Sequence, residues 1–193
     1  MPFLTDPVLS PGALSHAPQP VIPTGDGLLL RPWRAEDAPA VHAVFQDPVM
    51  HQWHARSADS VAEVGEWIEG WLKDWAEERT AQWAVVDADT DRLAGRVGLR
   101  ELRLDEGRAE TAYWTAPEAR GQGVAARATT ALTRWALDDI GFHRLELWHA
   151  VGNEASCRVA AKTGYALEGT LRSAVLHPDG WHDMHLHARV QGD

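Results

Sequence analysis

The chain has 193 residues, 45% hydrophobic and 24% charged, which is the composition of one ordinary globular domain. Its apolar runs are too short to cross a membrane, and 28 acidic against 18 basic residues give a net charge of −10, which opposes nucleic-acid binding. A single cysteine, Cys157, and the lack of a secretory signal lead us to expect a reducing, cytoplasmic location.

The first 27 residues form a separate compositional segment. They contain six of the 11 prolines, which fix the backbone and remove hydrogen-bond donors. We therefore expect residues 1–27 to be a proline-rich arm that is neither a helix nor a central strand. Two interpretations stay open: a disordered tail, or an arm that packs on the body of the protein or on a second subunit of a homodimer.

The rest of the chain alternates between strand and helix patterns. Leu28–Arg31 predicts a short strand and Glu36–Phe45 a helix. A long helix is expected over Asp59–Arg79, with Asp59 or Ser60 as its cap. Further strands are expected over Gln82–Val86, Leu93–Leu99, Glu110–Thr115, Arg144–Val151, Ala166–Leu176 and Trp181–Val190, and further helices over Val124–Asp138 and Asn153–Gly164. This order indicates an α+β fold with a largely antiparallel sheet, not a doubly wound parallel one.

A glycine-rich turn, Arg120–Ala126, lies between a predicted strand and a predicted helix. The first turn of a helix has unpaired N–H groups that attract anions, and glycines let a phosphate approach the backbone. We therefore expect a main-chain cradle for a diphosphate. As G-x-G-x-x-A, the turn would be a dinucleotide fingerprint, but Pro117–Arg120 stand where the buried strand should be, and only 67 residues follow Ala126.

The same turn also fits the pattern R-x-x-G-x-A through Arg120, Gly123 and Ala125. This resembles the R/Q-x-x-G-x-G/A signature of the GNAT acyl-CoA N-acyltransferases. Leu28–Trp33 with Glu36–Ala38, and Asn153-x-x-Ser156, are similar to the Rim-type (RimJ/RimL-like) branch of protein N-terminal acetyltransferases. The resemblance covers residues 28–190, which we take as the GNAT N-acetyltransferase domain.

The resemblance implies a GNAT fold, in which helices flank a mixed, mostly antiparallel sheet and two central strands splay apart to admit the pantetheine of acetyl-CoA. Backbone groups of Trp114 and Thr115 would bind the pantetheine amides, and Asn153 would cap its helix, bind pantetheine, or do both. The expected cofactor-binding residues are Trp114, Thr115, Arg120, Gly121, Gln122, Gly123, Val124, Ala125 and Asn153.

The implied reaction moves an acetyl group from acetyl-CoA to a primary amine by direct attack. The amine must lose a proton and the leaving thiolate must gain one. We expect Glu110 to be the base and Ser156 the acid. Other interpretations stay open: an ion pair of Glu110 with an arginine such as Arg108, a structural first-turn role for Ser156, and His149, His185 or His187 as the base. Cys157 is not required as a nucleophile.

Three other patterns contain metal-ligand residue types. The Asp87–Asp91 run resembles the start of a calcium loop, but Arg92 and Gly98 occupy the positions of its glycine and its final glutamate, so we predict a hairpin turn. Residues of the types that bind zinc occupy every second position at Asp183, His185 and His187. A second such pair, His51 and His54, is three residues apart. Because the GNAT family needs no metal, we expect none here.

The acceptor amine is not specified by these motifs. It is either a protein α-amino group, as the Rim-type resemblance suggests, or a small-molecule amine. The donor could instead be another acyl-CoA such as succinyl-CoA, and a catalytically silent CoA-binding module is a further alternative. Trp67, Trp71 and Trp75 of the long helix either pack in the core or wall the acceptor cleft, and the acidic face of that helix is either solvated surface or a rim that favours cationic acceptors.

Overall fold

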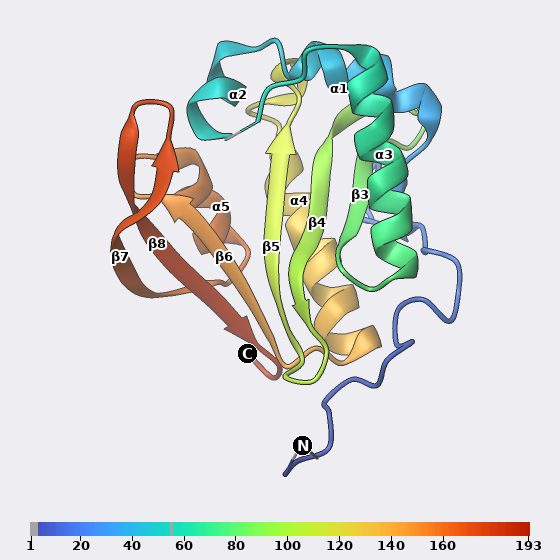
Figure 1. The fold of residues 1–193 in the computed structure, drawn as a ribbon, viewed down its shortest axis with the longest axis vertical. Coiled ribbons are helices and arrows are strands. Elements are labelled where there is room, and N and C mark those ends of the chain that lie inside the picture. Colours follow the sequence, from blue (N-terminus) through green and yellow to red (C-terminus); the bar gives the residue numbers. More distant parts are fainter. Residues whose placement is uncertain (1–3, 55) are drawn as a thin grey trace.

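The computed structural model describes residues 4–54 and 56–193. It contains one eight-stranded sheet with the strand order β1-β2-β3-β4-β5-β6-β8-β7 (Figure 1). Every neighbouring pair is antiparallel except β5 and β6. The predicted α+β class is therefore confirmed. The strands are β1 (Ile22–Pro23), β2 (Leu28–Pro32), β3 (Ala81–Asp87), β4 (Leu93–Arg103), β5 (Arg108–Thr115), β6 (Arg144–Ala150), β7 (Ala166–His177) and β8 (Gly180–Val190).

Helices cover both faces of the sheet, with α3 in front of β3 and α4 behind β4 and β5 in Figure 1. Side chains along β5 alternate between the two faces of the sheet. Trp114 lies on the face of α1 and contacts Phe45 at the end of that helix. Thr111 lies on the opposite face, where its hydroxyl is hydrogen-bonded to Tyr165, which is also hydrogen-bonded to Thr133 of α4. The helices are α1 (Ala38–Val44), α2 (Pro48–Trp53), α3 (Val61–Ala76), α4 (Val124–Arg134) and α5 (Glu154–Lys162).

Several helix boundaries differ from the prediction. The first predicted helix begins as a 3₁₀ turn, Ala35–Asp37, and α3 is shorter than expected, with Ser60 as its cap through a bond from the Glu63 amide. The helix predicted to reach Asp138 changes to a π-helical turn at Trp135. The prediction missed α2 altogether, although its signal is present: Asp47 caps a helix whose first residue is Pro48.

The tryptophans of α3 belong to the core. Trp71 packs against Trp33 with ring centroids 5.0 Å apart, and Trp67 packs edge-on against Phe45 at 5.3 Å. Trp75 is buried against Trp83 of β3. The core-packing interpretation of this stripe is therefore confirmed.

The proline-rich arm packs on the body of its own chain. Leu9 and Leu14 are buried, and the carboxylate of Glu78, just after α3, accepts hydrogen bonds from the amides of Gly12, Leu14 and Ser15 at 2.7, 2.7 and 3.0 Å. Farther along, β1 pairs with β2 at the edge of the sheet. The disordered-tail interpretation is therefore wrong for the described part of the arm.

The divergence of β5 and β6 positions the site. Their parallel pairing covers only Arg108–Glu110 against Arg144–Glu146. Beyond it the strands separate (Figure 1), and in the described parts of the chain no strand pairs with Thr111–Thr115 on the β6 side. The splayed pair expected from the sequence is thus present, and it leaves backbone groups of β5 free at its open end.

None of the helices within residues 4–54 and 56–193 combines the length and the apolar character needed to span a bilayer.

The Asp87–Asp91 run forms the β3–β4 turn, where the Asp87 carboxylate accepts hydrogen bonds from the amides of Asp89 and Thr90. The predicted hairpin turn is therefore confirmed.

Candidate active site

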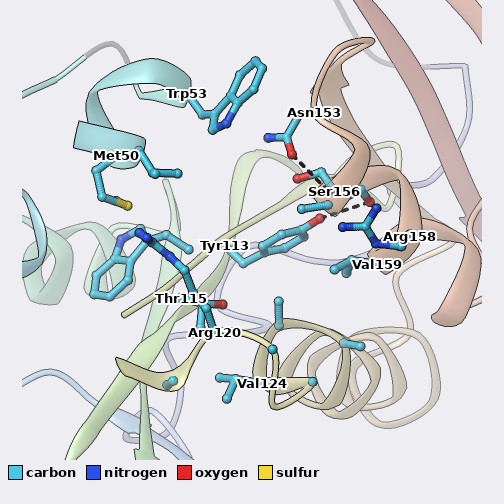
Figure 2. Close-up of a pocket in the computed structure, with 18 of the residues that line it drawn as sticks. Met50, Trp53, Tyr113, Thr115, Arg120, Val124, Asn153, Ser156, Arg158 and Val159 are labelled. Carbon is cyan, nitrogen blue, oxygen red and sulfur yellow. Dashed lines mark hydrogen bonds between the residues drawn. The ribbon is translucent and has the colours of Figure 1, made fainter. Parts of the chain in front are cut away.

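A cavity of about 530 Å³ opens where β5 and β6 diverge (Figure 2). Its walls come from α2, the end of β5, the glycine-rich turn with the start of α4, and α5. Of the 11 residues predicted for the site, Glu110 and Gln122 do not line it. The nine that do are Trp114, Thr115, Arg120, Gly121, Gly123, Val124, Ala125, Asn153 and Ser156.

The glycine-rich turn has the geometry of an anion cradle. Gly121 and Gly123 have φ of +77° and +75°, the left-handed region that favours glycine. A Cβ on Gly121 would have no neighbour within 4 Å, so a ligand can approach the backbone there. Gly123 is the N-cap of α4, and no side chain among the described residues caps this helix. Its first-turn amides are therefore free to bind an anion.

The arginines beside this cradle are held by aspartates. Arg120 binds Asp47 through two hydrogen bonds of 3.0 and 3.2 Å, and this contact lowers the pKa of the Asp47 carboxyl. Arg127 binds Asp26 of the arm, with its Nε 2.6 Å from a carboxylate oxygen. These arginines therefore fix the turn and α4 to neighbouring segments. Gln122 donates to the carbonyl of Glu118 and lines a separate hollow beside the cradle.

The charge of the cavity wall is opposite to that of the whole chain. Besides Arg120, which Asp47 holds, the wall contains the exposed Arg158 and Lys162 of α5, and its described lining contains no Asp or Glu. Arg158 pairs with Glu154 outside the cavity at 3.6 Å in an exposed contact. Since the chain as a whole has a net charge of −10, this local balance favours a polyanionic ligand.

Asn153, Ser156 and Tyr113 lie close together on one wall of the cavity (Figure 2). The side chain of Asn153 accepts a hydrogen bond from the Ser156 amide at 3.1 Å, so its predicted role as the cap of α5 is confirmed. The Tyr113 hydroxyl donates to the Ser156 carbonyl in a long contact of 3.5 Å. Burial raises the pKa of Tyr113 to about 12, so the phenol keeps its proton at neutral pH.

Sequence reasoning did not select Tyr113 as a proton donor. The signal was the alternation along β5, which places Tyr113 on the same face as Thr115 and opposite Trp114. This face is the one covered by α4 and α5, because Thr111 on it is bonded to Tyr165.

Glu110 lies at the closed end of the splayed pair and carries an ion pair. Its carboxylate oxygen Oε1 is 2.5 Å from the guanidinium of Arg100, which lies opposite Glu110 on the neighbouring strand β4. Arg108 pairs instead with Glu106 and Glu146. The ion pair anticipated for Glu110 therefore exists, but with Arg100 in place of Arg108. Alternation along β5 puts Glu110 on the face of Trp114, away from α4 and α5.

None of the alternative bases, His149, His185 and His187, lines the cavity, whereas His54, which the sequence suggested only as part of a metal-ligand pattern with His51, does. Burial, with Arg96, Arg100 and His177 nearby, lowers the pKa of His54 to about 4, so this ring is neutral at physiological pH. The His51 ring instead bonds the carbonyl of Phe45 at 2.7 Å, and no cluster of metal-ligand side chains in the described chain includes either residue.

The second group of histidines lies under α5. His149 faces His187 across β6 and β8, and burial lowers the pKa of both rings. Asp183, which the sequence grouped with His185 and His187, instead accepts a hydrogen bond from the amide of Ser173. The period-two pattern of Asp183, His185 and His187 is therefore not brought together as one set, and Asp183 is not part of the cluster that contains the two histidines.

The long helix does not border the cavity. No residue of α3 is among the residues that line it, Asp74 and Glu77 pair with Arg79, and Glu78 holds the arm. The hypothesis of an acidic, tryptophan-walled acceptor cleft on this helix therefore has no support in the structure.

Comparison with known proteins gives consistent results. The family described as acetyltransferase (GNAT) domain matches residues 27–166. A Bacillus subtilis (strain 168) protein named uncharacterized N-acetyltransferase YoaA is 27% identical over 173 residues, 89% of this chain and 97% of that relative. The ribosomal-protein-serine acetyltransferase of Escherichia coli (strain K12) is 30% identical over 100 residues, 52% of this chain and 56% of that protein.

Among solved structures, the RimL ribosomal L7/L12 alpha-N-protein acetyltransferase in complex with coenzyme A has a TM-score of 0.82 to this chain. The identity is 21%, and the match covers 89% of this chain and 98% of that one. This likeness confirms the fold that the sequence resemblance implied.

Proposed function

This chain belongs to the GNAT acetyltransferase family, and we propose that its cavity binds acetyl-CoA and catalyses transfer of the acetyl group to a primary amine. The observation that carries the proposal is the continuity of the cavity, in which the free edge of β5 leads to the uncapped N-terminus of α4. A long ligand with amides in its middle and a diphosphate beyond them fits such a surface.

Each part of the donor has a matching part of the wall. Backbone groups of Trp114 and Thr115 would bind the pantetheine as an added strand. The amides that follow Gly123 would bind the diphosphate, where the helix dipole favours negative charge. Arg158 and Lys162 supply positive charge for the remaining phosphate. The complex of the RimL structure with coenzyme A supports this assignment.

The chemistry requires two proton transfers. A C–N bond forms as the C–S bond breaks, so one proton leaves the amine and one reaches the sulfur. We propose Ser156 as the donor to sulfur, because it lines the cavity beside the pantetheine path. Tyr113 is the second candidate, since it is half-buried next to Ser156, lines the cavity and keeps its proton. Glu110 is proposed as the base. Because it does not line the cavity, an intervening water would carry the proton to it.

We propose a protein α-amino group as the acceptor. Two similar proteins, a ribosomal-protein-serine acetyltransferase and the RimL ribosomal L7/L12 alpha-N-protein acetyltransferase, are named for acetylating proteins, which supports this class over small amines. A mass-spectrometric screen tests it directly: the enzyme is incubated with acetyl-CoA or succinyl-CoA and either N-terminal peptides or a panel of small amines. A mass gain of one acetyl group on peptide α-amines supports the proposal, and acetylation of small amines alone contradicts it.

The screen also separates the enzyme from a silent CoA-binding module. If Ser156 protonates the thiolate, Ser156→Ala should lower the rate of acetyl transfer while its affinity for acetyl-CoA stays unchanged. Tyr113→Phe is the matched comparison, because it removes the neighbouring hydroxyl. If Ser156→Ala keeps the normal rate and Tyr113→Phe is slow, the proton that reaches the sulfur comes from Tyr113. If the unaltered protein transfers no acetyl group to any acceptor in the screen, the silent CoA-binding module is favoured.

A further inference from the structure

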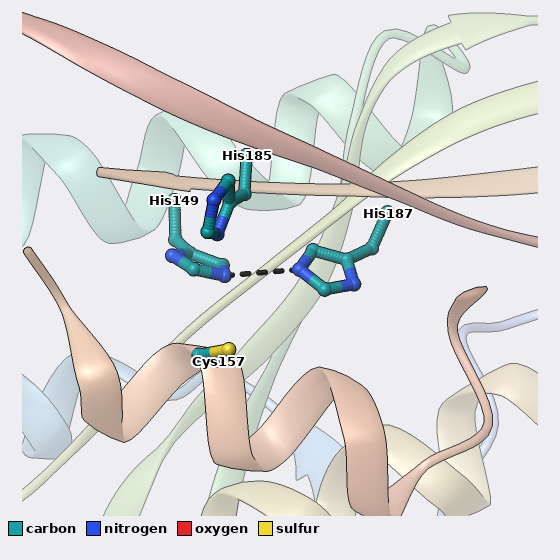
Figure 3. Close-up of side chains that lie close together, drawn as sticks. All are labelled: His149, Cys157, His185 and His187. Carbon is teal, nitrogen blue, oxygen red and sulfur yellow. Dashed lines mark hydrogen bonds between the residues drawn. The ribbon is translucent and has the colours of Figure 1, made fainter. Parts of the chain in front are cut away.

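Four side chains with metal-ligand atoms meet between α5 and the sheet, outside the residues that line the cavity (Figure 3). His149 comes from β6, His185 and His187 from β8, and Cys157 from α5. One ligand atom from each lies within 4.8 Å of the others. His149 and His187 are each only 4% exposed. His185 and Cys157 are half-buried, so three imidazoles and one thiol lie close together at a site that solvent can reach.

Hydrogen bonds determine which ring nitrogens carry protons. The Nδ1 atom of His149 is 2.8 Å from the carbonyl oxygen of Ala150, and that of His187 is 3.2 Å from the carbonyl oxygen of Tyr165. A carbonyl only accepts, so in both rings Nδ1 must donate its proton. In a neutral ring the other nitrogen, Nε2, then carries a lone pair.

These two lone pairs face one another. The Nε2 atoms of His149 and His187 are only 3.1 Å apart, and neither has a proton to donate in this tautomer. Beside them the Nδ1 atom of His185 is buried without a hydrogen-bond partner among the described residues. Facing acceptors on buried rings are unfavourable unless a proton or a metal cation lies between them. Imidazoles whose Nδ1 groups donate to backbone carbonyls are also oriented as metal-binding histidines usually are.

We propose that His149, His185, His187 and Cys157 form a zinc site. Zinc at Zn–N distances of about 2.0–2.1 Å in a tetrahedron separates its nitrogen ligands by about 3.3 Å, close to the observed 3.1 Å. On binding, the Cys157 thiol loses its proton to solvent and binds as the thiolate. Because four protein ligands fill the tetrahedron, the site is structural and has no open position for substrate.

The site would join α5 to β6 and β8. The same helix carries Ser156, next to Cys157, and is capped by Asn153. A metal here would therefore hold one wall of the acetyl-CoA cavity against the sheet. The inference depends only on the four side chains and goes beyond the proposed acetyl transfer.

A second group of metal-ligand types serves as the internal control. His177, Asp179 and His182 lie on the β7–β8 hairpin. The His182 ring is already paired with the Asp179 carboxylate at 2.7 Å, and Asp179 is exposed. The ring also stacks on His177, whose Nδ1 atom is buried without a hydrogen-bond partner among the described residues, but no pair of facing ring nitrogens like that of His149 and His187 is found among the described hydrogen bonds of this group. We therefore expect the hairpin to contribute nothing to the site.

Metal titration of the untagged protein tests the proposal. After treatment with a chelator, the full-length protein is titrated with Zn²⁺ under reducing conditions, and binding is followed by calorimetry and by the melting temperature. We expect one equivalent to bind and to raise the melting temperature. Co²⁺ in place of Zn²⁺ should give the intense visible bands of tetrahedral cobalt and a thiolate charge-transfer band. Absence of stoichiometric binding, or an octahedral cobalt spectrum without the thiolate band, would overturn the proposal.

Substitutions locate the metal. Cys157→Ser should abolish the thiolate band, and His187→Gln should weaken Zn²⁺ binding by at least about tenfold, while His182→Ala should leave both unchanged. Circular dichroism shows whether each variant is folded, and the cobalt spectrum of the unaltered protein decides the thiolate ligand even if a variant does not fold. Loss of binding in His182→Ala, with full binding in Cys157→Ser, would place the metal on the hairpin and contradict the proposal.

Discussion

At the scale of single residues, the wall of the cavity contains two hydroxyl side chains that we propose as candidates for proton transfer. Ser156 and Tyr113 touch each other, and both line it. Glu110, in contrast, is on the other face of β5 and is bound to Arg100. The family resemblance favours Glu110, because several GNAT enzymes have a glutamate near this position of the strand. What its carboxylate contacts is decided instead by the alternation of side chains along β5 and by Arg100, which lies opposite it on β4.

Glu110→Gln tests the proposed base. If Glu110 accepts the amine proton through a water, the variant should lower kcat by roughly 10²–10⁴-fold while leaving acetyl-CoA affinity unchanged. Steady-state kinetics across a range of pH, with acetyl-CoA affinity measured by calorimetry, provide the check. Arg100→Gln is the control for the ion pair, because it leaves the carboxylate in place. A Glu110→Gln enzyme that keeps the wild-type rate at every pH would rule out this role.

Tyr113 should ionise only in strongly alkaline solution. Burial raises its pKa in the folded state to about 12, above the ordinary value near 10. Because the folded state favours the neutral phenol, Tyr113 contributes stability below pH of about 10, and this contribution is lost as the pH rises through about 12.

Tyrosinate absorbance tests this directly, since the chain has only two tyrosines. The pKa of the second, Tyr165, is raised by burial as well. The folded protein should therefore form tyrosinate only above the ordinary range, and urea should restore ordinary titration. Tyr113→Phe should remove one of the two phenols from the titration. Tyrosinate in the folded protein near pH of about 10 would contradict the assigned burial.

At the scale of elements, the anion cradle consists of the glycine-rich turn and the N-terminus of α4. The left-handed glycines end the turn in the orientation that α4 needs, and the missing cap leaves its amides unpaired. The sequence pattern predicted this element well, because glycine positions and helix starts are local properties. It did not predict that Arg120 would be held by Asp47, because α2 was not anticipated.

Gly123→Asp tests the cradle. We expect acetyl-CoA, and not NAD, to raise the melting temperature of the unaltered protein, and the variant to lose this shift, because a carboxylate would stand where the diphosphate binds. Gly164→Asp is the matched control: its φ of +76° is almost the same as the +75° of Gly123, but it lies after the end of α5. Stabilisation by NAD, or an unchanged shift in Gly123→Asp, would contradict the assignment.

At the scale of the whole molecule, the arm is part of the folded domain. Glu78 links it to the end of α3 through hydrogen bonds from the amides of Gly12, Leu14 and Ser15. Burial alone would raise the pKa of the Glu78 carboxyl, but these amides lower it overall. The contact therefore contributes stability above the ordinary pKa of a glutamate, and this contribution is lost as the pH falls through the lowered value.

Glu78→Ala should destabilise the protein by about 1–3 kcal/mol, because it leaves three partly buried amides without their charged acceptor. Urea unfolding measures this, and the deficit should shrink in acid, where the native carboxylate is protonated too. Glu77→Ala is the control, since Glu77 makes only exposed ion pairs with Lys73 and Arg79. Equal stability of the two variants would show that the Glu78 contact adds nothing to the stability of the fold.

The sequence by itself determined the features that depend on local chemistry. The glycine-rich turn, the Asn153 cap, the strand periodicities and the family signature are each written in a few consecutive residues, and the structure bears out their geometry. Only the tertiary structure decided which distant side chains meet. The pairing of Glu110 with Arg100 and the meeting of His149 with His187 and Cys157 depend on strand register and helix docking. No local pattern encodes these, because a register is fixed by the burial of the whole sheet.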